Sequence, residues 1–175
     1  MLTQIVAGRV YDFSHVVGRW GEGLGFNNPV KAVLGEGDLV CVLNRGYEVV
    51  PIVPWNRSGK SARVNMLTIG KVPGDEEIVG EFGKYGDSPG QLIWPAGIAL
   101  NNRRNVHVTD EWMNQVSTFD LEGNLLGLWG APGEGDGQFN RPSGIAVDGE
   151  DNLNVVDSFN NRVQKFSGEG KYLSQ

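Results

Sequence analysis

The sequence has few of the residues from which most metal sites and catalytic centres are built. It contains one cysteine, Cys41, which excludes an internal disulfide framework and a zinc site built on cysteine. Its two histidines, His15 and His107, have no second metal ligand close to them in sequence. The short motifs of nucleotide-binding loops, serine hydrolases and zinc proteases do not occur. We therefore expect no bound cofactor and no metal.

Long apolar runs and an excess of positive charge are also absent. No apolar segment approaches the roughly 18 residues of a membrane span, and the N-terminal residues lack the basic and apolar regions of a signal peptide. The 21 Asp and Glu residues outnumber the 15 Lys and Arg residues, for a formal net charge of −6. A global basic footprint for nucleic acid is thus missing. The sequence predicts a cytoplasmic protein with no membrane partner.

Glycine, by contrast, is abundant. It accounts for 26 of the 175 residues, about twice the usual share of ~7%. The glycines follow no Gly-X-Y period, which excludes a collagen-like helix. So many glycines indicate many turns, and many turns in a short chain indicate many short strands. The composition therefore favours an all-β fold.

An internal repeat of 47 residues organises the chain. Residues 80–128 align with residues 127–175 without a gap, and 18 of these 49 positions are identical. Each copy holds four short stretches rich in Val, Ile and aromatic residues, bounded by turn residues. Four strands in a repeat of this length are typical of one propeller blade, and propellers have 4–8 blades.

The repeat divides the chain into blades. Residues 92–130 and 139–175 are two full copies, the second with a truncated outer strand. Residues 26–83 are a third copy, which carries 19 extra residues, most of them in a long loop over residues 45–62. Residues 8–20 match the outer strand of a leading blade. We interpret the whole chain as a single partial propeller domain.

The last copy resembles the NHL repeat. The resemblance rests on Gly-Gln-Phe-Asn-Arg-Pro-Ser-Gly-Ile-Ala-Val-Asp at 137–148, Asn-Leu-Asn-Val-Val-Asp-Ser at 152–158 and Asn-Arg-Val-Gln-Lys-Phe at 161–166. It implies a β-propeller, six-bladed in most known members, of which this chain would hold about three four-stranded blades. Three interpretations stay open: a fragment of a longer propeller, a half-propeller closed by a second copy in a homodimer, and an open three-bladed arc.

One set of recurring polar residues is predicted to hold turns. Asn44, Asp110 and Asp157 end the second strand of each copy. A short side-chain acceptor at that place can take hydrogen bonds from the backbone N–H groups of the following turn. Coordination of a cation by these residues is the alternative.

Recurring aromatic residues and glycines are predicted to serve packing. Trp20, Phe82 and Trp129 each precede a glycine on the expected outermost strand, where a large apolar side chain would pack between blades. Gly97 and Gly144 precede the expected innermost strand, where crowding near the axis favours a residue without a side chain.

The residues outside the repeat are the candidates for function. In a propeller, the loops that join second to third strands share one rim with the blade-to-blade crossings, and binding residues concentrate on such loops. The 45–62 loop brings Trp55, Arg57 and Lys60 to this rim, a basic and aromatic spot on an acidic protein.

Two further aromatic residues belong to the same rim. Trp112 and Phe159 occupy one repeat position, where a usual NHL copy has glycine. They could stack on a ligand or pack on the neighbouring loop. Arg103 and Arg104 are expected on the opposite rim, in a solvated turn.

Three classes of function follow from the resemblance and the residues. The leading hypothesis is a non-enzymatic binding or interaction platform that holds a protein or small-molecule ligand at the rim. A metal-dependent propeller enzyme, a lyase or a lactone-type hydrolase, is the alternative, with its site partly in further blades. Single-stranded RNA binding is the third; the acidic composition disfavours it, and Trp55, Arg57 and Lys60 keep it open.

Overall fold

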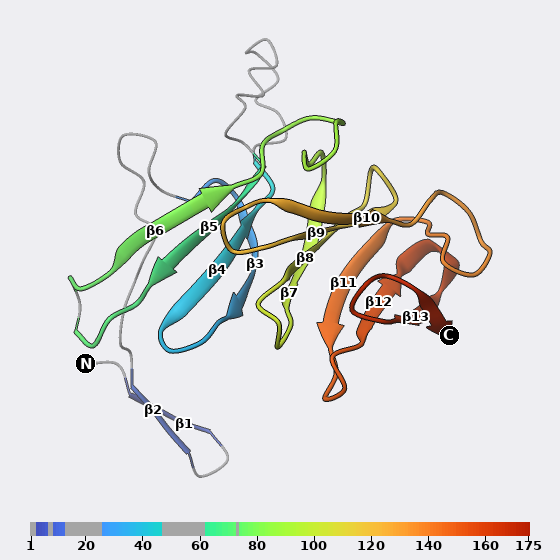
Figure 1. The fold of residues 1–175 in the computed structure, drawn as a ribbon. Coiled ribbons are helices and arrows are strands. Elements are labelled where there is room, and N and C mark those ends of the chain that lie inside the picture. Colours follow the sequence, from blue (N-terminus) through green and yellow to red (C-terminus); the bar gives the residue numbers. More distant parts are fainter. Residues whose placement is uncertain (1–2, 7–8, 13–25, 47–61, 73) are drawn as a thin grey trace, which may run out of the picture.

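The structure is a computed structural model that describes residues 3–6, 9–12, 26–46, 62–72 and 74–175. Within these ranges the protein is all-β, as predicted, and contains three four-stranded antiparallel sheets (Figure 1). In each sheet the strands follow one another in chain order, which is the arrangement of a propeller blade. No helix in the described part of the chain is long and apolar enough to span a membrane.

The blades coincide with the repeats. The first blade contains β3 (Pro29–Leu34), β4 (Leu39–Asn44), β5 (Arg63–Thr68) and β6 (Glu77–Phe82). The second contains β7 (Pro95–Leu100), β8 (Val106–Asp110), β9 (Gln115–Phe119) and β10 (Leu125–Trp129). The third contains β11 (Pro142–Val147), β12 (Leu153–Asp157), β13 (Arg162–Phe166) and β14 (Tyr172–Ser174).

Two smaller elements complete the described structure. A short 3-10 helix, Ser158–Asn160, connects β12 to β13. Near the N-terminus, β1 (Thr3–Val6) pairs with β2 (Arg9–Asp12) as a two-stranded ribbon. The outer strand expected over residues 8–20 falls mostly outside the described residues, as does Trp20.

Each blade begins with a proline. Its first strand changes register against the second strand directly after Pro29, Pro95 and Pro142. Proline has no N–H to donate, so the first position of a strand is one of the few places in a sheet that tolerate it. The shared proline and register shift give the three blades the same entry geometry.

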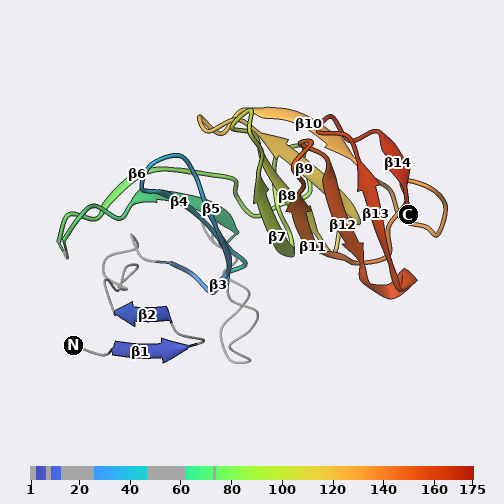
Figure 2. The ribbon, with the colours of Figure 1, turned by 90° about the horizontal axis from the view of Figure 1, so that it is seen from below.

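The first strands of the blades lie next to one another, and the blades follow each other along an arc (Figure 2). Gly97 on β7 approaches β11 so closely that an added Cβ would lie 2.3 Å from the backbone oxygen of Ser143. The hydroxyl of Thr109 donates a hydrogen bond to the same oxygen at 2.6 Å. Crowding between inner strands therefore explains the glycine, as the sequence predicted.

Aromatic side chains fill the space between blades. Phe82 of the first blade packs on Phe119 of the second with ring centroids 5.1 Å apart. The same contact recurs one blade later, where Trp129 packs on Phe166 at 4.6 Å. The predicted role of Phe82 and Trp129 in packing between blades is confirmed.

A glycine supports each of these aromatic contacts. An added Cβ at Gly123 would lie 2.4 Å from Phe82, and one at Gly170 would lie 2.5 Å from Trp129. Both glycines also have positive φ angles, 85° and 84°. Close approach and backbone conformation together explain why the Glu-Gly pair recurs after the third strand.

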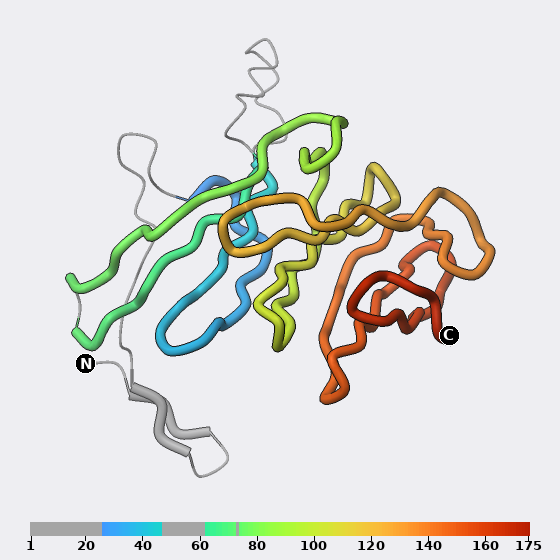
Figure 3. Tube along the Cα trace, viewed as in Figure 1, coloured from blue at the N-terminus to red at the C-terminus, as the bar shows by residue number. Residues whose placement is uncertain are grey.

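The connections separate into two rims. The hairpins between first and second strands turn at the lower end of the molecule in Figure 3, whereas the connection from β8 to β9 lies at the upper end. The crossings, which are the segments that join one blade to the next, also lie at the upper end. Asn160, which follows β12 at that end, donates a hydrogen bond at 2.8 Å to the carbonyl of Gly133 in the crossing between β10 and β11. The candidate functional residues are therefore sought at the upper rim.

Candidate functional site

Buried acceptors at the ends of β4, β8 and β12 build the upper rim. Asp110 accepts hydrogen bonds from the backbone N–H groups of Trp112 and Met113 at 3.0 and 3.1 Å, which is the predicted turn. Its other carboxylate oxygen accepts from Ile93 and Trp94, at 2.7 and 3.0 Å. Burial raises the pKa of Asp110, and these four donors oppose that rise.

The same connection recurs in the other blades. Asn44 accepts from the backbone N–H of Asn27 at 2.7 Å, and Asp157 accepts from that of Asn140 at 2.7 Å. Each acceptor ties the segment before its blade to the end of the second strand. Among the described residues, only Asp110 also accepts from the backbone of the following turn, so the predicted turn is found in the second blade. Two positions per blade are thereby brought together: the residue before the proline and the residues after the acceptor.

Trp112 and Phe159 project from this rim, at the one repeat position singled out in the sequence. Their exposed fractions are 61% and 62%. The ring of Trp112 packs against that of Trp94, with the two ring centroids 6.1 Å apart. Large aromatic rings that stay exposed on a rigid scaffold suit ligand contact.

Arg45, which follows β4 of the first blade, contacts Trp94 and Glu111 near the same rim. Its guanidinium lies 4.9 Å from the ring centroid of Trp94. It also donates a hydrogen bond to Glu111 of the second blade, with Nη2 and Oε2 2.8 Å apart. Arg45 and Glu111 are both about one-fifth exposed, so the pair is partly shielded from water.

Arg141 connects the second and third blades. Its guanidinium carbon lies 5.9 Å from the Trp94 ring and 5.1 Å from the Phe159 ring. Such distances are typical of cation–π contacts. We call the six residues the aromatic–arginine surface: Arg45, Trp94, Glu111, Trp112, Arg141 and Phe159.

The sequence singled out only part of this surface. Trp94 and Arg141 were missed because they differ from each other, although both occupy the position before the blade's proline. Arg45 and Glu111 were missed for the same reason, since each follows the acceptor that ends the second strand. The available signal was position in the repeat rather than residue identity. Trp55, Arg57 and Lys60 lie outside the described residues.

The opposite rim differs from expectation in one respect. Arg103 is exposed, but it is not simply solvated: it donates to Glu169 of the third blade at 2.6 Å. The backbone N–H of Asn102 donates to Asp151, also of the third blade, at 2.8 Å. These contacts join blades, so this rim has a role in the scaffold.

Two further titratable side chains, His107 and Cys41, are buried within the strands. His107 is fully buried; its Nδ1 lies 3.0 Å from the hydroxyl of Thr118, and burial lowers its pKa to about 4. Burial also raises the pKa of Cys41 to about 11, so its thiol is protonated at neutral pH. Among the described residues, no three His, Cys, Asp or Glu side chains lie close enough together to hold a metal ion.

The third blade matches a known family model. Residues 139–166 match the NHL repeat, a span that runs from the crossing before β11 to the end of β13. The chain thus contains an NHL repeat in a propeller fold, as the sequence predicted.

Solved structures share this fold. A gluconolactonase from Xanthomonas campestris aligns with a TM-score of 0.58 at 17% identity, over 99% of this chain and 54% of its own. Virginiamycin B lyase from Staphylococcus aureus aligns with a TM-score of 0.55 at 16% identity, over 84% of this chain and 40% of its own. The chain spans about half the length of the gluconolactonase and 40% of that of the lyase. No curated protein sequence matches this chain.

Proposed function

We propose that this protein is a non-enzymatic binding platform whose ligand occupies the aromatic–arginine surface. The observation that carries the proposal is the exposure of Trp112 and Phe159 within a cluster to which all three blades contribute. Exposed aromatic rings that gather in one patch are typical of interaction surfaces. A surface assembled from three blades is also held rigidly, which lowers the entropy lost on binding.

The position of the surface supports the same proposal. It lies where the loops after the second strands meet the crossings, and both sets of loops are held by buried acceptors such as Asp110. The scaffold beneath is packed between blades by Phe82 and Trp129. Loops on a rigid frame are where binding residues concentrate.

A metal-dependent lyase or lactone-type hydrolase is the second candidate. Its support is that the gluconolactonase and the virginiamycin B lyase share the fold. At 16–17% identity this likeness extends to the fold alone. An enzyme of this kind needs several ligands that converge on one point, and those ligands would have to come from outside the described residues.

A selection experiment tests the platform proposal. Random peptides displayed on phage are selected on the chain, and binders are then measured against the double variant Trp112→Ala/Phe159→Ala. Loss of the two rings should weaken the selected peptides by tenfold or more, since stacking contributes about 0.5–1.5 kcal/mol per aromatic pair beyond area burial.

A matched control removes an exposed apolar side chain elsewhere. Leu126 on β10 is 54% exposed and lies outside the upper rim. Leu126→Ala should leave the same peptides bound with unchanged affinity. Peptides that lose affinity with Leu126→Ala but tolerate the double variant would refute the proposed surface.

A further inference from the structure

The guanidinium of Arg141 is the one part of the aromatic–arginine surface that is charged and lacks a polar partner. No described residue accepts a hydrogen bond from its side chain or forms an ion pair with it, whereas Arg45 is paired with Glu111. The side chain is exposed, between the rings of Trp94 and Phe159. Five N–H donors of a rigid guanidinium are thus presented between two flat apolar groups.

Two hydrogen bonds fix the backbone conformation of Arg141. Its φ angle is 56°, a left-handed conformation that is uncommon for a residue with a side chain. The side chain of Asn114, from the loop after β8, accepts a hydrogen bond from its backbone N–H at 2.8 Å. The carbonyl of Arg141 accepts from Ser158 at 3.4 Å. Loops of two blades therefore fix the residue in place.

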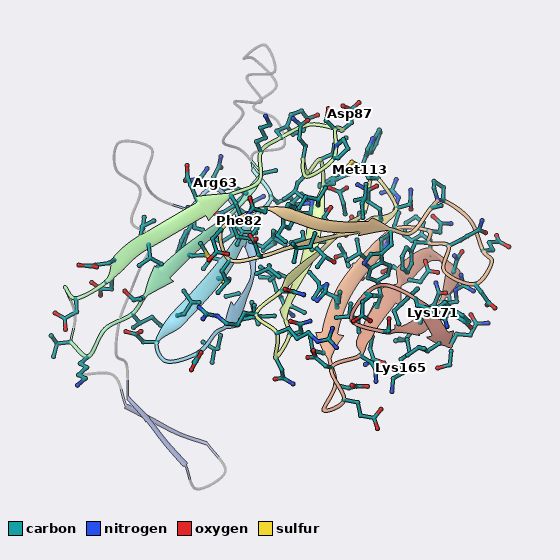
Figure 4. All side chains as sticks on the ribbon, viewed as in Figure 1. Arg63, Phe82, Asp87, Met113, Lys165 and Lys171 are labelled. Carbon is teal, nitrogen blue, oxygen red and sulfur yellow. The ribbon has the colours of Figure 1, made fainter. Side chains whose placement is uncertain are left out.

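The charges around Arg141 limit what can bind there. The described upper-rim segments are 45–46, 83–94, 111–114, 130–141 and 158–161. They contain three cations, Arg45, Lys84 and Arg141, and four carboxylates, Asp87, Glu111, Glu134 and Asp136. Figure 4 places Asp87 and Met113 at the upper end of the molecule. This balance opposes a polyanion such as single-stranded RNA, which needs a basic track. Arg141, the unpaired cation that lies beside the aromatic rings, can still take one anion.

From this placement, and on the basis of the proposed function, we infer that the surface recognises a peptide segment in which a carboxylate stands next to an aromatic side chain. The carboxylate would accept two parallel hydrogen bonds from Arg141. The neighbouring ring would pack against the exposed faces of Phe159 or Trp112. A single negative charge with a flat apolar neighbour matches the guanidinium of Arg141 and the two rings beside it.

Binding of two blocked dipeptides tests the inference. N-acetyl-Phe-Asp-amide and N-acetyl-Phe-Asn-amide have the same shape and differ in one charge. We expect the Asp peptide to bind about tenfold or more tightly, because a charge-assisted hydrogen bond to a carboxylate is stronger than a neutral one. Titrations followed by NMR at the Nε–H of Arg141 measure both affinities and report where the peptides bind.

Two variants complete the test. Arg141→Gln should abolish the preference for the Asp peptide, because the variant offers both peptides the same neutral amide. Arg104→Gln, an exposed arginine on the opposite rim, is the matched control and should keep the preference. A preference that survives Arg141→Gln would overturn the inference, and so would the absence of binding of the Asp peptide to the unmodified chain.

The remaining outcomes separate this inference from the proposed function. Equal binding of both dipeptides, lost with Trp112→Ala/Phe159→Ala, would leave the platform in place and refute the role of Arg141. Tighter, Arg141-dependent binding of an oligouridine would refute the peptide and assign the surface to RNA. The phage selection tests the proposed binding function independently of either result.

Discussion

At the scale of single residues, His107 couples stability to pH. It lies on β8, fully buried, and its Nε2 has no hydrogen-bond partner in the described part of the chain. Its pKa of about 4 lies below the roughly 6.5 of an exposed histidine. Between these values the unfolded chain binds a proton that the folded chain does not, so folding stability falls as the pH falls through 6.5 toward 4.

Replacement of this histidine tests the coupling. Asn154 stands at the same repeat position in the third blade, which makes His107→Asn a change that the blade framework already accommodates. From pH 7.5 to pH 5 the unmodified chain should lose about 2 kcal/mol more unfolding free energy than the variant. Urea denaturation at the two pH values measures this difference. Equal losses in both proteins would show that His107 titrates normally.

Residue identity also explains which residues the sequence could assign and which it could not. Trp129 and Gly97 were assigned correctly because packing between blades requires the same kind of residue in every copy. Trp94 and Arg141 share a repeat position but not a chemistry, and only the fold brings them within 6 Å of each other. Contacts between non-identical residues of different blades carry no signal in a single sequence.

At the scale of elements, the third strand of the second blade differs from that of the third blade. In the third blade, Arg162 on β13 pairs with Asp157, with Nε and Oδ2 2.9 Å apart. Gln115 on β9 occupies the equivalent position in the second blade, so Asp110 has no such cation. The raised pKa of Asp110 means that its ionisation at neutral pH costs folding stability.

Gln115→Arg should supply the missing cation. We expect the variant to be more stable at pH 7 by about 1 kcal/mol, because a hydrogen bond to a charged group is worth somewhat more than a neutral one. The gain should shrink as the pH falls and Asp110 takes up a proton. Thermal and urea denaturation at pH 7 and pH 4 measure it. A gain that is the same at both pH values would argue against a new ion pair.

The regular parts of each element followed from the sequence. Stretches rich in Val, Ile and aromatic residues predicted the strands, and the abundant glycines predicted the turns, because each satisfies a local backbone requirement. The ion pair from Arg103 to Glu169 was not predicted, since it joins a hairpin of one blade to a hairpin of the next. Its partners are 66 residues apart in the chain.

At the scale of the whole molecule, the outward face of the third blade is open among the described residues. Val156 and Val163 are 39% and 50% exposed. Their equivalents in the second blade, Thr109 and Val116, are fully buried. The face of the second blade is covered by the third blade, whereas the equivalent face of the third blade is exposed at the end of the arc. Exposed apolar faces favour association.

We expect the isolated chain to self-associate through this face. Sedimentation velocity over a hundredfold range of concentration should show species larger than 19.0 kDa. Val163→Lys, which places a charge on the open face, should shift the chain toward monomer. A discrete dimer would favour closure of the ring by a second copy, whereas open-ended aggregation would favour a propeller fragment. A sharp monomer at every concentration would contradict both.

The most direct test of the binding surface is to locate a bound peptide on the molecule. A phage-selected peptide is bound to the isotopically labelled chain, and cross-saturation NMR identifies the residues that it touches. We predict loss of signal at Trp94, Trp112, Arg141 and Phe159, all on the upper rim. Loss confined to the opposite rim around Arg104, or to the open face of the third blade, would contradict the assignment of this surface as the binding site.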